Sequence, residues 1–156
     1  MHTLLFVIEG KNMEYMIGNE NDLEGIIELY KQLVENNDFL KVNDAYKIWN
    51  EIQKYNIKYF LAKENGKIIG SCYICVIPNL TYMGRSIGYI ENVIIDKSYR
   101  RKGVGKNLME MAINYAKENN CYRVVLQSGL KRIEAHKFYE NIGFNGESKK
   151  AYEVIF

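Results

Sequence analysis

Residues 89–106 constrain the fold of this chain more than any other stretch. Residues 89–96 (Tyr-Ile-Glu-Asn-Val-Ile-Ile-Asp) are mostly apolar and predict a buried strand. A basic segment with two glycines follows at residues 100–105 (Arg-Arg-Lys-Gly-Val-Gly), and a helical pattern begins directly after it. The chain must therefore pass from a strand through a glycine turn into a helix, which predicts a fold that mixes strands and helices.

The glycine segment has the properties of an anion-binding site. Gly103 and Gly105 let the backbone approach a ligand and adopt turn dihedrals that a Cβ would forbid. The first amides of the next helix have no intrahelical acceptor, and the helix dipole adds partial positive charge there. Three neighbouring cations complete a site suited to a pyrophosphate. The spacing is not G-x-G-x-x-G, because Leu108 stands where the third glycine would fall, and it is not a P-loop.

Length and charge exclude several classes of protein. The 156 residues are the size of one domain, and a net charge of +2 is too small to indicate nucleic-acid binding. No apolar run approaches the roughly 18 residues of a membrane span, and residues 4–8 lack the flanks of a signal peptide. We expect a single cytoplasmic domain over residues 1–156, with residues 1–12 as an N-terminal extension if Met13 is the native start.

The three cysteines allow a redox, a metal-binding or a structural role. Cys72 and Cys75 have the C-x-x-C spacing of a redox or zinc pair. They lie in an apolar strand pattern, however, where alternation places them on opposite faces, and no second C-x-x-C or nearby histidine accompanies them. We therefore expect these two and Cys121 to be core thiols in a reducing compartment, with no metal site.

The remaining pattern predicts a mixed α/β chain. Periodicity and turn signals favour strands at 14–17, 56–62, 67–77, 121–127 and 152–156, and helices that begin near Asn21 or Asp22, at Asn43, at 106 and at 132. Asn65-Gly66 favours a type I′ hairpin turn. The order of strand, helix and strand over 89–127 predicts a parallel crossover. Trp49 and other apolar residues form a stripe on the second helix, which either packs in the core or lines an acceptor pocket.

Two motifs together resemble the GCN5-related N-acetyltransferase (GNAT) superfamily. Residues 100–105 match its R-x-x-G-x-G signature, and residues 135–144 (Ala-His-Lys-Phe-Tyr-Glu-Asn-Ile-Gly-Phe) match A-x-x-F-Y-E-x-x-G-F. The similarity of motifs covers residues 67–144, and the order of elements agrees over the whole chain. The resemblance implies a central, mostly antiparallel sheet with a splayed parallel strand pair and about four flanking helices.

The resemblance also implies a binding mode for acetyl-CoA. Pantetheine would pair with the backbone of the 89–96 strand where the parallel pair opens, and the Val93 amide would polarise the thioester carbonyl. The amides of residues 101–106 would hold the pyrophosphate. Arg132 stands where the family often has an asparagine, and we expect it to reach a phosphate instead. The implied coenzyme-binding residues are Val93, Ile94, Ile95, Arg100, Arg101, Lys102, Gly103, Val104, Gly105, Lys106, Arg132 and Tyr139.

Glu91 and Tyr139 are the candidate catalytic residues. An amine must lose a proton before it attacks a thioester, and Glu91 is a carboxylate in an apolar strand, two residues from Val93 and so expected on the same face. Residues 88–93 resemble a G-x-I-E-N/D-V run of some aminosugar acetyltransferases. Tyr139 matches the family's usual general acid, which protonates the departing thiolate. The alternatives are a Glu91 paired with a surface cation and a Tyr139 that only packs.

These observations favour an N-acetyltransferase that uses acetyl-CoA. We expect direct transfer in a ternary complex to the primary amine of a small molecule, such as an aminosugar, an amino acid or a polyamine. Two alternatives are an acyl-CoA-binding sensor without turnover and a protein or peptide N-terminal acetyltransferase. We expect no nucleic-acid or membrane partner, and the chain could form a homodimer.

Overall fold

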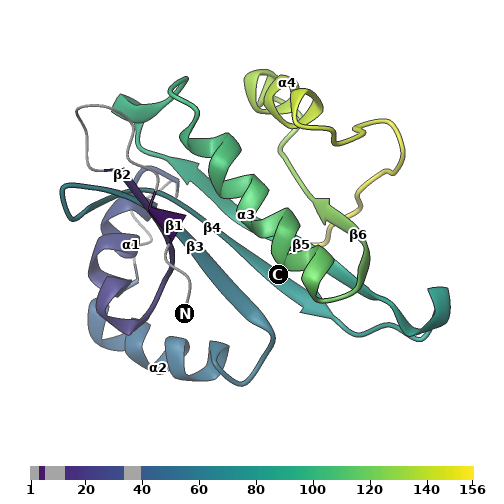
Figure 1. Cartoon of the computed structure of the whole chain (residues 1–156), viewed down its shortest axis with the longest axis horizontal. Coiled ribbons are helices and arrows are strands. Elements are labelled where there is room, and N and C mark those ends of the chain that lie inside the picture. The colour runs from purple at the N-terminus through teal and green to yellow at the C-terminus, as the bar shows by residue number, and fades with distance from the viewer. Residues whose placement is uncertain (1–3, 6–12, 34–39) are drawn as a thin grey trace. The chain divides into compact units, whose positions relative to one another are not determined.

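The computed structural model describes residues 4–5, 13–33 and 40–156 (Figure 1). The strands are β1 (Leu4–Leu5), β2 (Met13–Ile17), β3 (Ile57–Glu64), β4 (Lys67–Ile77), β5 (Ser86–Ile95) and β6 (Cys121–Leu126). The helices are α1 (Leu23–Tyr30), α2 (Val42–Ile52), α3 (Val104–Glu118) and α4 (Ile133–Asn141). The chain forms two compact units, Met1–Val125 and Leu126–Phe156, which are described separately.

The strands form one sheet in the order β1-β2-β3-β4-β5-β6, and each pair from β1 to β5 is antiparallel. The hairpin between β3 and β4 turns at Asn65 and Gly66, whose φ angles of 50° and 79° are both positive, as a type I′ turn requires. The predicted hairpin is therefore confirmed.

The crossover from β5 through α3 to β6 places the last strand beside β5. Ser86 N–H donates to Asn120 O at 3.2 Å, and Arg85 Nη2 donates to Cys121 O at 2.9 Å. The two strands thus meet where both begin, and they run in the same direction and diverge toward their ends (Figure 1). This is the splayed parallel pair that the sequence predicts.

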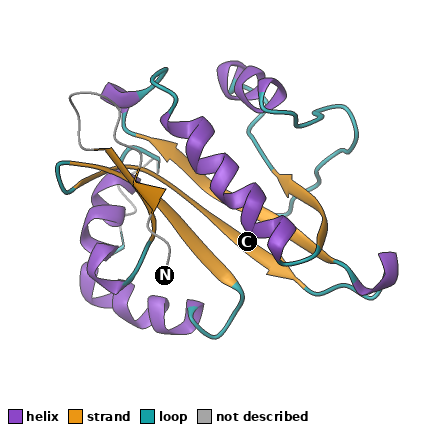
Figure 2. Cartoon of the chain, in the orientation of Figure 1, coloured by secondary structure: helices purple, strands orange, loops and turns teal. Residues whose placement is uncertain are grey.

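Helices cover both faces of the sheet (Figure 2). On one face, a Cβ added to Gly25 of α1 would meet Ile68 at 2.8 Å, so this helix lies close against β4. On the other face, a Cβ added to Gly70 would meet Leu108 of α3 at 2.9 Å. Glycine at these two positions lets each helix approach the sheet. We call these the α1 face and the α3 face.

A β-bulge interrupts the pairing of β4 with β5. Ser71 pairs with Ile94 and Tyr73 pairs with Glu91, so two steps along β4 match three steps along β5. Asn92 has a φ of 51° at this point, in the left-handed region that asparagine tolerates better than most residues.

The bulge changes which side chains face which helix. A Cβ at Gly88 would lie 3.5 Å from Ala116 of α3, and Ile95 lies against Gly70 on the same α3 face. An even-numbered and an odd-numbered residue of one strand share a face only because a residue is inserted between them. The expectation that Glu91 and Val93 share a face by simple alternation is therefore wrong, because the inserted residue lies between them.

Some predicted boundaries differ from the structure. The terminal strand at 152–156 is wrong, because these residues form no strand and the large apolar ones among them are exposed. These residues are mostly apolar, which favours a strand, but a strand also needs a neighbour to complete its hydrogen bonds. Within residues 1–12, the described pair Leu4–Leu5 is strand β1, and the rest of that expected extension lies outside the described residues.

Helix α1 has Asp22 as its N-cap, one of the two residues predicted for it, although the Asp22 side chain makes no capping bond to α1. A capping box lies just before it, on the short 3-10 turn Glu20–Asp22, where Asn19 Oδ1 accepts from Asn21 N and Asn19 N donates to Asp22 Oδ2. Two other helix starts are displaced. The N-cap of α2 is Lys41 rather than Asn43. Helix α3 begins at Val104, so Gly103 is its N-cap and the second glycine lies inside the first turn.

Candidate active site

Glu91 lies immediately before the bulge on the α1 face. It pairs with Tyr73 across the sheet, and within the described part of the chain it makes no ion pair. The alternative of a Glu91 neutralised by a surface cation is therefore not what the structure shows. Burial raises the pKa of the Glu91 carboxyl. A carboxylate in this state is suited to accept a proton from an amine, because its basicity is greater than that of a solvated one.

Polar side chains from two further elements gather at the bulge. Tyr30 comes from the end of α1 and Ser71 from β4. The Tyr30 Oη and Ser71 Oγ atoms are buried and, among the described residues, have no hydrogen-bond partner. Burial raises the pKa of Tyr30 to about 12. Buried polar atoms with unused capacity are costly, so this cluster can serve a polar ligand or water.

The glycine turn before α3 is an open set of amides. Arg101 and Gly103 have φ angles of 62° and 82°, and a Cβ at Gly103 would meet nothing within 4 Å. Alternating backbone of this kind can direct successive N–H groups into one concavity. The N-cap Gly103 provides no side-chain cap, so the first amides of α3, at Val104, Gly105 and Lys106, are left for an anion. The Val104 side chain itself is buried in the core.

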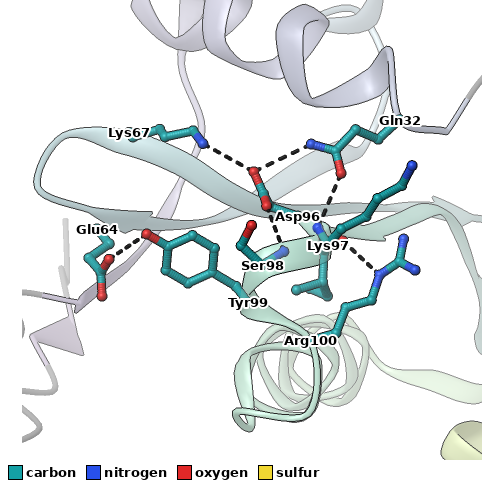
Figure 3. Close-up of polar contacts among 9 residues, drawn as sticks. Gln32, Glu64, Lys67, Asp96, Lys97, Ser98, Tyr99 and Arg100 are labelled. Carbon is teal, nitrogen blue, oxygen red and sulfur yellow. Dashed lines mark hydrogen bonds and ion pairs between the residues drawn. The ribbon is translucent and has the colours of Figure 1, made fainter.

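A polar network fixes the turn that leads into this segment (Figure 3). Buried Asp96 accepts from Ser98 N at 2.9 Å, Lys67 Nζ at 3.1 Å and Gln32 Nε2 at 3.3 Å. Gln32 Oε1 in turn accepts from Lys97 N at 3.1 Å. The Ser98 amide holds the pKa of Asp96 below its usual range, with Lys67 and Gln32 adding to the effect. The network ties the chain after α1 to the end of β5.

Two cations of the glycine turn contact neighbouring groups, and Figure 3 shows the hydrogen bond of Arg100. Arg100 Nε donates to Ile95 O at 3.3 Å, and Lys102 Nζ lies 5.0 Å from the centre of the Tyr99 ring. Tyr99 Oη donates to Glu64 Oε2 at 2.5 Å, which fixes that ring. The charged groups therefore stay near the open amides and remain exposed to solvent and to a phosphate.

A cavity of about 170 Å³ opens between α1, α2 and the sheet on the α1 face. The walls of this cavity are apolar or aromatic and include Leu23, Ile27, Tyr30, Ala45, Ile48, Trp49, Ile52 and Tyr59. The aromatic stripe of the second helix thus divides: Ala45 and Trp49 are buried, Ile48 is half-exposed at the cavity, and Tyr55 is exposed elsewhere.

The second unit carries the other predicted residues. Tyr139 lies on α4 and is 7% exposed, with its ring 5.3 Å from Phe138 and 6.1 Å from Phe144. These contacts orient the ring within the unit. Arg132 is the N-cap of α4 and its side chain makes no capping bond. His136 Nε2 is hydrogen-bonded to Gly129 O at 2.9 Å, so it supports the loop before the helix.

The three thiols are free. Burial raises the pKa of Cys72 to about 12, so this thiol stays neutral, and Cys121 is also buried. Among the described residues, no group of three or more His, Cys, Asp or Glu side chains could hold a metal ion. In the same part of the chain, every helix is too short or too polar to cross a membrane.

Sequence reasoning missed three contributors to the site. The first is Asn92, whose tolerance of left-handed backbone was a usable signal for the bulge. The others are Gln32 and Asp96, which are 64 residues apart in the chain, so no local pattern announces their pairing.

The site brings a basic carboxylate, a bulged strand and an uncapped helix start onto one strand and the turn after it. Acyl transfer from coenzyme A to an amine needs these parts: a proton acceptor, free backbone donors and a pyrophosphate cradle. The fold and the site thus define an acetyl-CoA-dependent N-acetyltransferase.

Comparison with known proteins gives the family. The family model of the Acetyltransferase (GNAT) family matches residues 23–144, and the chain belongs to this family. A glucosamine 6-phosphate N-acetyltransferase from Trypanosoma brucei brucei is 32% identical over 141 residues, which cover 89% of this chain and 93% of that protein. An N-alpha-acetyltransferase 30 from Dictyostelium discoideum is 35% identical over 85 residues, or 54% of this chain and 44% of that protein.

A solved structure shares the fold. The crystal structure of an acetyltransferase from Trypanosoma brucei has a TM-score of 0.81 and 28% sequence identity, and the match covers 92% of this chain and 99% of the other. The predicted GNAT fold, with its mostly antiparallel sheet and splayed parallel pair, is confirmed.

Proposed function

We propose that this enzyme transfers the acetyl group of acetyl-CoA to the primary amine of a small molecule, by direct attack within a ternary complex. The observation that carries the proposal is the position of Glu91. Burial raises the pKa of its carboxyl, and it makes no ion pair with another residue that the structure describes. It lies on the strand that leads into the open amides of the glycine turn. Acetyl-CoA would supply the acetyl group and the thiolate leaving group.

The coenzyme-binding role of the glycine turn rests on its backbone. The amides of residues 101–106 would hold the pyrophosphate, with Arg100, Arg101, Lys102 and Lys106 adding charge. Residues 93–95 would pair with pantetheine through their backbone, and the Val93 amide beside the bulge would donate to the thioester oxygen. In the second unit, Arg132 would reach a phosphate.

The two catalytic residues would move protons in opposite directions. Glu91 would accept a proton from the attacking amine, directly or through a water, as the new C–N bond forms. Tyr139 would donate its phenolic proton to the sulfur as the C–S bond breaks, and the ring contacts with Phe138 and Phe144 would keep its hydroxyl oriented. No covalent enzyme intermediate is needed, because Cys72 stays a neutral buried thiol and Cys121 is also buried.

A thiol-release assay with acetyl-CoA and a panel of amines tests this function. The panel contains aminosugars, amino acids, polyamines and simple alkylamines, and calorimetry with coenzyme A measures the coenzyme site independently. We expect tight coenzyme binding and thiol release that depends on one class of amine. Coenzyme binding without release by any amine would overturn the proposal in favour of a non-catalytic sensor.

A second acceptor class is favoured by one comparison. An N-alpha-acetyltransferase 30, which is an acetyltransferase of a different kind, is 35% identical to this chain over 85 residues. Peptides with a free α-amino group therefore belong in the panel. Release that depends on a peptide of several residues, and on no free amine, would replace the small-molecule acceptor with a protein N-terminus.

We also propose a cytoplasmic homodimer. The three free thiols suit a reducing compartment, and Tyr152, Val154, Ile155 and Phe156 are exposed apolar side chains that a second copy would cover. Light scattering on the protein as it elutes from a size-exclusion column measures the mass of the assembly. A monomeric mass at micromolar concentration would contradict the dimer.

A further inference from the structure

The cavity on the α1 face has the size and lining of a site for a compact apolar group. Its volume is about 170 Å³, similar to the roughly 150 Å³ of an engineered apolar cavity that binds benzene. Trp49 and Tyr59 form part of its wall, with their ring centres 5.4 Å apart. Half-exposed Ile48 and Leu40 also line it, so the cavity reaches the surface and a ligand can enter.

A row of paired residues crosses the sheet from the cavity wall to Glu91. Tyr59 pairs with Tyr73 on the next strand, and Tyr73 pairs with Glu91 on the strand after that. The Tyr59 and Tyr73 ring centres are 5.1 Å apart. Paired residues point to the same face, and neighbouring strands are about 4.8 Å apart, so the cavity wall lies on the order of 10 Å from Glu91.

The lining of the cavity is not suited to bind a phosphorylated acceptor. Among the described residues that line it there is no Lys, Arg, His, Asp or Glu. A phosphate or a sugar ring would lose its hydration there without gaining a charged partner or enough hydrogen bonds. In the proposed function the exposed cations of the glycine turn bind the phosphates of the coenzyme, so they do not bind a phosphate of the acceptor.

From this geometry we infer that the cavity is the specificity pocket for the acceptor, and that the acceptor is a primary amine on a short chain that ends in a compact alkyl or aryl group. The amine would lie at Glu91 and the apolar group in the cavity, beside Trp49. This inference rests on the proposed function, because it assigns the acceptor of the same reaction. It differs from the sugar phosphate named for the Trypanosoma relative.

Trp49 provides a direct readout of occupancy. It is the single tryptophan of the sequence and forms part of the cavity wall. We would titrate ethylamine, butylamine, hexylamine and phenethylamine against tryptophan fluorescence, with and without saturating coenzyme A. We expect the fluorescence to change saturably with amine concentration. The affinity for the amine should rise roughly fourfold with each added methylene until the cavity is full. The same ranking is expected in KM from thiol release.

Glucosamine 6-phosphate is the opposing ligand in the same experiment. A lower KM for this sugar phosphate than for hexylamine or phenethylamine, or no saturable fluorescence change with either apolar amine, would overturn the inference. If the inference about the pocket fails in this way, thiol release with any amine would still support the proposed function. Saturable fluorescence without thiol release would support the pocket and count against the enzyme.

Two variants that fill the cavity test its location. Ala45→Leu places three further carbons in the cavity, and Ile48→Phe narrows it from the half-exposed side if the buried substitution prevents folding. Each should raise KM for phenethylamine about tenfold or more and leave KM for ethylamine nearly unchanged. Lys47→Leu, at an exposed position of the same helix outside the cavity, is the matched control and should change neither. Equal KM shifts for both amines would overturn the assignment.

Discussion

Gln32 joins the chain that follows α1 to the turn after β5 by holding Asp96 and its neighbour together. Its Nε2 donates to Asp96 Oδ2 at 3.3 Å, and its Oε1 accepts from Lys97 N at 3.1 Å. The α1 side of the fold, which carries the proposed acceptor cavity, is thereby coupled to the turn that leads into the proposed coenzyme-binding loop. A rigid loop binds its ligand more tightly because less conformational freedom is lost on binding.

The Asp96→Asn variant should loosen this turn. The amide group keeps one oxygen acceptor but loses the charge that Lys67 and the Ser98 amide stabilise. We expect about 2 kcal/mol of lost folding stability at neutral pH and a weaker affinity for coenzyme A. Gln32→Glu, which places a like charge beside Asp96, should weaken coenzyme binding in the same direction.

The folding stability that the Asp96→Asn variant loses should depend on pH in a defined direction. The folded-state pKa of Asp96 lies below its unfolded value, so the carboxylate contributes stability above the unfolded pKa of about 3.9 and loses it as pH falls through the folded pKa. Urea unfolding of the parent protein and of Asp96→Asn from pH 7 to pH 3 measures the difference in their free energies of unfolding. A stability difference that is the same at both ends would contradict the assignment.

The Gly103→Ala variant tests the backbone of the coenzyme loop. Its Cβ would meet nothing within 4 Å, so the substitution introduces only the strain of a φ of 82°, about 1–2 kcal/mol. Gly66→Ala is a matched control, because Gly66 has a φ of 79° and an equally empty surrounding. Both should lower the melting temperature, but calorimetry should show weaker coenzyme binding only for Gly103→Ala. The same loss of affinity in both variants would show that strain acts through global stability.

The Tyr139→Phe variant removes the proposed acid and keeps its packing. The ring contacts with Phe138 and Phe144 remain, so coenzyme affinity should change little. Turnover should fall by about a hundredfold, because thiolate would leave without a proton donor. Tyr152→Phe removes a tyrosine hydroxyl from an exposed position and should leave kcat unchanged. Unchanged kcat in the Tyr139 variant would remove this residue from the mechanism.

The parts of this fold that were predictable are those determined locally. The Asn65-Gly66 turn and the strand, glycine turn and helix over residues 86–118 are determined by the dihedrals and periodicity of neighbouring residues. Helix α3 begins at Val104, two residues before the predicted start at Lys106, since helix ends carry the weakest signals.

The parts that were not predictable depend on residues distant in the sequence. The bulge at Asn92 exists because β4 and β5 pair on both sides of it, and it reverses the face of each later side chain. Residues 152–156 are mostly apolar residues of types common in strands, but composition says nothing about the presence of a neighbouring strand. The cavity likewise needs two helices and a sheet, so from the sequence alone the aromatic stripe of the second helix could be assigned either to the core or to a pocket.

The Glu91→Gln variant tests the proposed base through the pH dependence of the reaction. The base must be ionised to accept a proton, so kcat/KM should fall as pH drops through the Glu91 pKa, which burial places above the ordinary glutamate value. The variant should lose at least a hundredfold in kcat and lack this acidic limb. A free amine also needs deprotonation, so two acceptors of different pKa must be compared by thiol release from pH 5 to pH 9. A limb that moves with the pKa of the amine belongs to the acceptor, and a limb that stays in place and disappears in Glu91→Gln belongs to Glu91. If the limb persists in the variant, Glu91 only binds the acceptor.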